Sequence, residues 1–340
     1  MNTILILVLI HFKASIQAVK LATTCIFVLR PILQTIYVKK KLKINLKNGD
    51  NGYNIKQKWD GLAQHIAFVI HNNADIVILT LSGNILDISV YSIYSLIVLN
   101  VTRVIEAFNN GIDATFGDMI AKEETEKLNK SFKIYEGIYL TIATIIFSST
   151  LLLIIPFTEI YTKGISDANY VRPVFAYIFV IAEFIYVIKQ VYYNLVKIGG
   201  QFKQTKKGAY IEAIINIIVS IALVYRYGLV GVAIGTLVAM TIRTTEIIYY
   251  TSKNILGRRA LYAVKRIIAV VLEVLIIVVI VNTIPTVEIT GYVDWTIQAI
   301  IVAGIAVLVV IPINCLLFKD NVKTAVEKIK SIIAEKYLQN

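Results

Sequence analysis

The sequence predicts an all-α fold, a polytopic bundle of transmembrane helices. Hydrophobic residues make up 57% of the 340-residue chain and charged residues only 16%, against roughly 25% charged residues in soluble domains. Several nearly uncharged runs reach about 20 residues, the length at which a helix crosses about 30 Å of hydrocarbon. Backbone in lipid must form helices or a closed barrel, and residues 275–281 (LIIVVIV) and 300–310 (IIVAGIAVLVV) lack the alternation of barrel strands. We therefore expect helical spans.

Nine runs are long enough to be full spans. They cover approximately residues 15–37, 60–81, 85–112, 132–156, 171–196, 206–225, 228–250, 265–284 and 294–318. Cys25 and Cys315 both lie inside these spans, which favours packing over a disulfide, metal or redox role. The apolar run 4–10 lacks the basic flank and the small-residue cleavage site of a signal peptide, so we interpret it as a helix end.

Basic residues divide unevenly between the two sides of the predicted bundle. One side holds 25 Lys and Arg and the other holds 4, the first side comprising residues 38–58, 117–133, 197–207, 251–266 and 319–340. Basic loops near membrane ends stay in the cytoplasm, so we assign that side and the C-terminus to the cytoplasm. The net charge of +12 therefore belongs to loops rather than to a basic soluble face, and we do not expect a nucleic-acid partner.

Two segments resemble a known family. Residues 206–250 (KKGAYIEAIINIIVSIALVYRYGLVGVAIGTLVAMTIRTTEIIYY) place Asn216 in one helix, Gly228 and Gly231 at the turn into the next, and Gly235-Thr236 one turn later. This pattern resembles the C-terminal half of bacterial polysaccharide-repeat (O-antigen type) flippases, members of the MATE-like multidrug/oligosaccharidyl-lipid/polysaccharide superfamily. Residues 58–80 (KWDGLAQHIAFVIHNNADIVILT) look like the helix that opens the second six-helix lobe of that family.

The resemblance implies a division of the chain into five parts. Residues 1–37 would be a remnant of the first lobe, 38–58 a basic cytoplasmic linker, 59–250 the second lobe, 251–318 two additional spans and 319–340 a basic tail. About five helices of the family's first lobe have no counterpart, so we expect a truncated chain. The amphipathic pattern of the tail fits a helix lying on the anionic inner leaflet or a solvated helix end.

Small residues recur at four-residue spacing within the span 228–250. Gly231, Gly235 and Ala239 would share one helix face. Lipid provides no hydrophobic drive for helices to associate, so close backbone approach at such a face supplies it. We favour helix packing over substrate contact for these residues, and we expect Gly228 to shape the preceding turn.

Polar residues form stripes on three of the predicted spans. His71 and Asp75 are four residues apart, so that the carboxylate could hold the imidazole, and Asp60 and Gln64 share their face. The second stripe comprises Arg103, Glu106, Asn110 and Asp113, and the third comprises Glu183, Tyr186, Gln190 and Asn194. Charges inside a membrane usually face a cavity or one another, so three stripes predict a shared hydrated cavity.

The predicted cavity suits an anionic, sugar-bearing lipid. Arg30 and Lys20 in the first span, beside Pro31, and Arg103 are the candidates for a diphosphate, because guanidinium binds phosphate oxygens bidentately. The alternatives are structural. Arg103–Glu106 and Arg243–Glu246 could be ion pairs that only stabilise the helices, and His71–Asp75 could be an internal hydrogen bond rather than a coupling site.

The sequence contains no familiar catalytic motif. It lacks a G-x-x-x-x-G-K-[ST] loop, an H-E-x-x-H pair, clustered Cys and His, and a G-x-S-x-G turn. We therefore expect neither an enzyme nor a resident cofactor or metal, and we expect energy from an ion gradient, the membrane potential or downhill flux.

These expectations, with the family resemblance, favour a flippase of the bacterial cytoplasmic membrane that moves polyprenyl-diphosphate-linked oligosaccharide for surface polysaccharide synthesis. Its partners would be that substrate, membrane lipids and other polysaccharide assembly proteins. A drug or cation exporter of the same fold and a non-transporting remnant remain as alternatives. A membrane glycosyltransferase or polymerase fits less well, because such enzymes carry a large extramembrane loop and the outer loops here are short.

Overall fold

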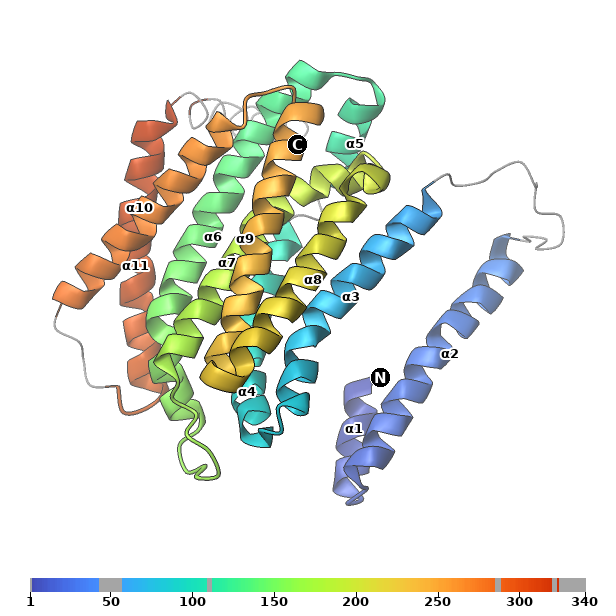
Figure 1. Ribbon diagram of the computed structural model, residues 1–340, viewed down its shortest axis with the longest axis vertical. Helices are drawn as coiled ribbons and strands as arrows, with labels where there is room; N and C mark the ends of the chain where they lie inside the picture. Colours follow the sequence, from blue (N-terminus) through green and yellow to red (C-terminus); the bar gives the residue numbers. More distant parts are fainter. Residues whose placement is uncertain (1, 43–56, 109–111, 285–288, 320–322, 324–340) are drawn as a thin grey trace, which may run out of the picture. The chain divides into compact units, whose positions relative to one another are not determined.

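The computed structural model describes residues 2–42, 57–108, 112–284, 289–319 and 323, which form two separate compact units. The first unit, residues 1–56, contains α1 (Asn2–His11) and α2 (Ile16–Leu42). The chain reverses between these helices, and α1 packs back against α2 (Figure 1). Helix α2 continues through Pro31 and carries Lys20 and Arg30, both exposed within this unit.

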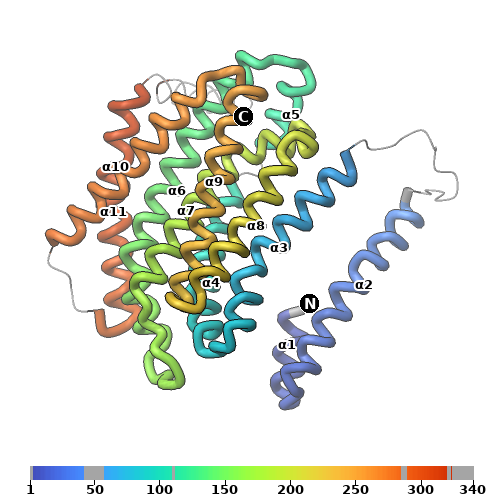
Figure 2. Tube along the Cα trace, in the orientation of Figure 1, coloured from blue at the N-terminus to red at the C-terminus, as the bar shows by residue number. Residues whose placement is uncertain are grey.

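The second unit, residues 57–340, holds the remaining nine helices of the described chain. They are α3 (Lys58–Leu81), α4 (Ile85–Glu106), α5 (Asp113–Ala121), α6 (Thr125–Tyr161), α7 (Pro173–Ile198), α8 (Phe202–Tyr227), α9 (Leu229–Asn254), α10 (Leu261–Thr283) and α11 (Tyr292–Leu317). The long helices run alternately up and down the bundle, and the short α5 lies near one end (Figures 1 and 2). The described residues contain no β-strand.

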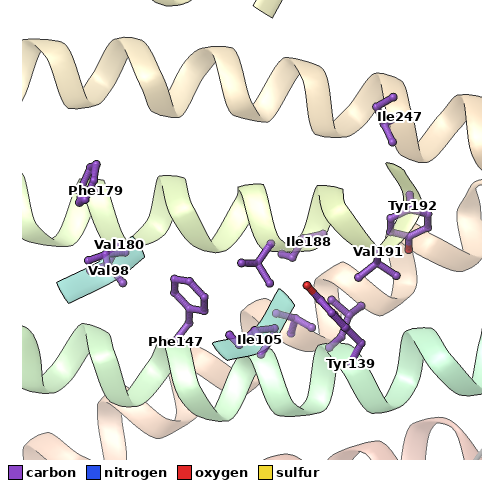
Figure 3. Close-up of a cluster of buried hydrophobic side chains, with 14 of the residues drawn as sticks. Val98, Ile105, Tyr139, Phe147, Phe179, Val180, Ile188, Val191, Tyr192 and Ile247 are labelled. Carbon is purple, nitrogen blue, oxygen red and sulfur yellow. The ribbon is translucent and has the colours of Figure 1, made fainter. Parts of the chain in front are cut away.

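Helices α7 and α9 form the centre of this bundle. In each of them 61% of the most apolar 18-residue window is buried, more than in the other spans. Helix α9 packs against α7 and α8, and α7 packs against α4 and α6. Large side chains fill the space between α7 and its neighbours, among them Phe147, Phe179 and Tyr192 (Figure 3).

Glycines allow α8 and α9 to approach closely. A Cβ on Gly231 would meet the backbone carbonyl of Leu223 at 2.6 Å, and a Cβ on Gly235 would meet the backbone nitrogen of Ser220 at 2.8 Å. Ala239, one turn later, is fully buried. Gly228 joins the two helices with φ +53°, a left-handed conformation that favours glycine. The small residues of α9 therefore lie against α8.

Helices α10 and α11 pack on α6 and are tied to the bundle by buried polar contacts. Arg258, in the turn before α10, donates two hydrogen bonds to Glu136 of α6, at 2.8 and 3.0 Å, and Tyr192 of α7 donates to the same carboxylate. Farther along, Asn314 of α11 accepts from Arg266 at 2.5 Å and donates to Glu273 at 2.7 Å. These contacts link α6, α7, α10 and α11.

The predicted all-α transmembrane fold is confirmed, with changes of detail. Among the described residues, eight helices are long and apolar enough to cross a membrane: α2, α3, α4, α6, α7, α8, α9 and α11. The predicted span 265–284 is a continuous 23-residue helix, α10, with Arg266 and Glu273 buried in it, but it is not among the eight. The span predicted over 85–112 ends at Glu106, and α5 begins a separate helix at Asp113. Most of the linker 38–58 and of the tail 319–340 lies outside the described residues.

The Gly235 contact predicts a measurable cost for a single methyl group. Gly235→Ala should lower the stability of the folded chain by about 1–3 kcal/mol, because the Ser220 backbone cannot move aside. The measurement is the thermal unfolding midpoint in detergent. Gly304→Ala on α11 is the matched control, since a Cβ there meets nothing within 4 Å. Equal midpoints for the two variants would contradict the proposed tight contact.

Candidate functional site

Two adjoining cavities lie among α3, α4, α7, α8 and α9. The larger has a volume of about 580 Å³ and the smaller about 250 Å³. Phe68, Glu106 and Tyr186 line both. The lining therefore brings together side chains from these five helices and Asp113, the first residue of α5.

Most of the polar residues predicted from the three stripes line these cavities. Gln190 and Asn194 line the larger cavity, and Glu106 lines both. The smaller cavity is lined by His71, Asp75, Arg103 and Glu183. Asn110 lies outside the described residues, and Lys20 and Arg30 belong to the first unit.

Arg103 and Glu106 do not form the ion pair that their spacing suggested. Arg103 is exposed, and its Nη1 donates to Asn100 Oδ1 in the preceding turn at 3.2 Å. Glu106 Oε1 accepts a hydrogen bond of 3.2 Å from the Tyr186 hydroxyl on α7. Because each side chain has turned to a different partner, the Arg103 guanidinium forms no ion pair with a carboxylate of the described residues.

His71 and Asp75 are linked through a third residue rather than by a direct hydrogen bond. Asn216 Nδ2 lies 3.3 Å from His71 Nδ1 and 3.5 Å from Asp75 Oδ1. The Asp75 carboxylate also accepts from the Thr236 hydroxyl at 2.9 and 3.0 Å and from Tyr91 at 3.4 Å. Only 3% of Asp75 is exposed, and the hydrogen-bond donors recorded on its carboxylate are neutral. A buried carboxylate without a cation is costly, and binding a proton or a small cation removes that cost.

A cluster of charged residues, which the sequence analysis missed, forms part of the larger cavity wall. Lys189 Nζ of α7 lies 2.6 Å from Glu212 Oε1 of α8, and Arg243 Nε of α9 lies 3.5 Å from Glu212 Oε2. The Arg243–Glu246 ion pair, one of the alternatives considered from the sequence, is present at 2.7 Å, and Arg243 is buried. In the sequence, Lys189 and Glu212 are isolated charges within apolar stretches. Such isolated charges were the signal by which the cluster could have been predicted.

Neutral polar groups surround the cavity end of α3. Gln64 donates to Thr205 Oγ1 at 2.7 Å and accepts from the Tyr193 hydroxyl at 2.6 Å. Asp60, one turn earlier, pairs with Lys206 of α8 at 2.6 Å. The first half of the α3 stripe therefore faces α8, and Gln64 lines the larger cavity.

Carboxylates without basic partners outnumber such cations along the two cavities. Four acids that line the cavities form no ion pair within the described chain: Asp75, Glu106, Asp113 and Glu183. The same holds for two lining cations, Arg103 and Lys197. Lys197 Nζ lies 5.7 Å from the centre of the Tyr193 ring. The site offers both signs of charge.

An apolar cavity of about 310 Å³ lies between α4, α5 and α6. Its lining includes Ile105, Phe108 and Ile138. Ile105 precedes Glu106 in α4, so successive residues of this helix line the apolar cavity and the polar cavities. Helix α4 thus has an apolar cavity on one side and polar cavities on another.

Comparison with known proteins identifies a fold. No family model and no curated protein matches the chain. A structure of the lipid II flippase MurJ in an inward closed conformation is similar, with a TM-score of 0.52 and 16% identity over 78% of this chain. A second similar structure is a MOP superfamily transporter from Pyrococcus furiosus Vc1 (DSM3638), with a TM-score of 0.43 and 16% identity over 78% of this chain.

The chain covers 53% of the MurJ chain and 65% of the second transporter, so it spans about half to two thirds of the length of these proteins. At 16% identity the likeness to MurJ concerns the fold alone. Together with the apolar helices, it supports a multi-pass helical membrane protein whose fold is similar to that of MurJ.

The cavity predicts that two positions of α7 differ in water access. In a chain with Cys25 and Cys315 replaced by Ala, Gln190→Cys should react quickly with a sulfonated maleimide, because a thiol ionises in water. Ile181→Cys should react slowly, since this exposed apolar side chain does not line either cavity. Labelling rates in open membrane fragments provide the measurement, and equal rates would show that the site is dry.

Proposed function

We propose that this chain belongs to a flippase that moves polyprenyl-diphosphate-linked oligosaccharide units across the bacterial cytoplasmic membrane for surface polysaccharide synthesis. The observation that carries the proposal is the meeting of three polar stripes at adjoining cavities beside an apolar one. Transporters of this kind work by alternating access of a central site to the two sides of the membrane. The fold shared with MurJ supports such a mechanism.

Each part of the substrate has a matching surface. Cations along the cavities, Arg103 and Lys197 among them, are candidates for contact with the diphosphate. Amide and phenol groups suit sugar hydroxyls, and the lining supplies them as Gln190, Asn194, Tyr186 and Tyr193. The apolar cavity against α4 suits part of the polyprenyl chain.

His71 and Asp75 are the candidate coupling residues. Asp75 forms no ion pair within the part of the chain that the structure describes, and Asn216 links it to the imidazole. A proton or small cation bound here in one conformation and released in the other would connect an ion gradient to substrate movement.

The proposed orientation follows the distribution of basic residues. The loops rich in Lys and Arg and the C-terminus lie in the cytoplasm. The substrate is then loaded from the inner leaflet, where lipid-linked precursors would be assembled, and other polysaccharide assembly proteins are the expected partners.

Export of organic cations by the same fold is the second candidate. Four cavity carboxylates that form no ion pair with the described residues favour it, because a pocket for cationic compounds needs unpaired negative charge. Such a protein would lower the accumulation of a cationic dye such as ethidium in cells, whereas the flippase would not.

Arg103→Ala should lower surface polysaccharide about tenfold in cells that depend on this gene, because a charge-assisted contact to phosphate is lost. Arg103→Lys should retain part of the activity. Polysaccharide on the surface and lipid-linked oligosaccharide in the membrane are measured together, and the second should accumulate. Arg226→Ala, an exposed arginine at the end of α8, is the control. Unchanged polysaccharide in Arg103→Ala, with altered ethidium efflux, would favour the second candidate.

Asp75→Asn should uncouple transport from its ion gradient, because the side chain keeps its size and loses its charge. Substrate export is followed in cells while ionophores collapse the proton gradient or the Na⁺ gradient. The wild-type protein should respond to one ionophore and the variant to neither. Glu159→Gln, an exposed acid in α6, is the control. An Asp75→Asn protein that still responds would remove Asp75 from the coupling site.

A further inference from the structure

Three helices each contribute one buried charge to the wall of the larger cavity. Lys189 on α7, Glu212 on α8 and Arg243 on α9 all line it. The side chains are 7%, 9% and 3% exposed, respectively. Glu212 lies between the two cations, with one carboxylate oxygen toward each.

The buried part of this cluster holds two cations and one carboxylate, since Lys189 and Arg243 both face Glu212. Glu246 brings the formal charges into balance, but it is 38% exposed and pairs with Arg243. Burying an uncompensated charge is costly. The cluster is therefore suited to a second negative charge arriving from the cavity.

Contacts that do not involve Glu212 hold the two cations in place. Arg243 Nη1 donates to the Thr205 carbonyl at 2.9 Å and to Glu246 at 2.7 Å. The side chains of Arg243 and Glu246 pass close to Gly208, where a Cβ would collide with them. Lys189 Nζ lies 3.7 Å from Met240 Sδ and 5.0 Å from the centre of the Tyr186 ring. The position between the cations would thus persist if the Glu212 carboxylate left it.

We propose that Glu212 acts as an internal counter-ion that occupies an anion-binding position between Lys189 and Arg243, from which the diphosphate of the substrate displaces it. This inference rests on the proposed function for the identity of the anion. A carboxylate held by a lysine and an arginine has the same oxygen chemistry as a phosphate, which carries more charge and more oxygen atoms for the guanidinium. Glu212 lines the cavity, so its displaced carboxylate can enter the hydrated space.

Such a counter-ion would also determine specificity. A neutral headgroup cannot replace Glu212, because it would leave two buried cations with less negative charge than before. A diphosphate restores and exceeds the lost charge. The resting cavity would therefore remain closed to uncharged glycolipids.

The test measures anion binding to the purified full chain by calorimetry, with inorganic pyrophosphate and farnesyl diphosphate as probes. Glu212→Gln should bind pyrophosphate about tenfold more tightly than the wild type, because the competing carboxylate is gone. Glu246→Gln is the matched control and should give a smaller gain, since Glu246 is more exposed and does not contact Lys189. Adding Lys189→Met to Glu212→Gln should abolish the gain.

The outcomes separate this inference from the proposed function. Equal affinities in wild type, Glu212→Gln and Glu246→Gln would overturn the counter-ion role. Glu212→Gln could bind pyrophosphate more tightly than the wild type does, yet bind farnesyl diphosphate no more tightly than pyrophosphate. That result would support the anion site and contradict a lipid-linked substrate.

Glu212→Asp is the second variant, for use if Glu212→Gln does not fold. It shortens the side chain by one methylene while keeping its charge, and it should also increase the affinity for pyrophosphate.

Discussion

A charged group inside a membrane protein needs a partner, and this requirement organises the second unit. Glu136 accepts from both Arg258 and Tyr192, which connects the turn before α10 to α6 and α7. Glu212 joins α7, α8 and α9 through Lys189 and Arg243. In both places one buried carboxylate holds several helices, where lipid by itself provides no hydrophobic drive for their association. Removing a single member would leave the others uncompensated in a medium of low dielectric constant.

Much of the fold could be predicted from hydrophobic runs alone, because a bilayer imposes a minimum length on each helix. Helix termini were less accessible. The predicted span 85–112 runs past Glu106, yet α4 ends there and α5 begins at Asp113. A length criterion passes over this break because Phe108 and Ile112 are apolar, although the sequence Asn-Asn-Gly at 109–111 is typical of a turn.

The candidate site was predictable where several polar residues share one helix face and not where a charge stands alone. The polar stripes of α3, α4 and α7 follow helical periodicity. The predicted site residues that belong to these stripes and that the structure describes all line the two cavities. Partner choice was not predictable from spacing. Arg103 bonds Asn100 instead of Glu106, because Glu106 lies within reach of Tyr186 on another helix. Lys189 and Glu212 are separated by 23 residues and come together only through the packing of α7 against its neighbours.

Small residues make this burial of charge possible. Gly208 leaves the space through which Arg243 and Glu246 pass, and Gly137 does the same for Arg266. Gly231 and Gly235 instead bring the α9 backbone onto α8, which holds Thr236 within reach of Asp75. The cavity consequently has a firmly packed wall of α7 and α9 and a lightly packed wall of α4, whose most apolar window is only 28% buried. The buried ion pairs join α7 and α9 through Glu212 of α8, while Arg103 of α4 is exposed and, among the described residues, hydrogen-bonded to its own helix. A wall that moves between two conformations breaks the fewest costly contacts when it carries a cation outside the ion pairs and the opposite wall carries the buried network.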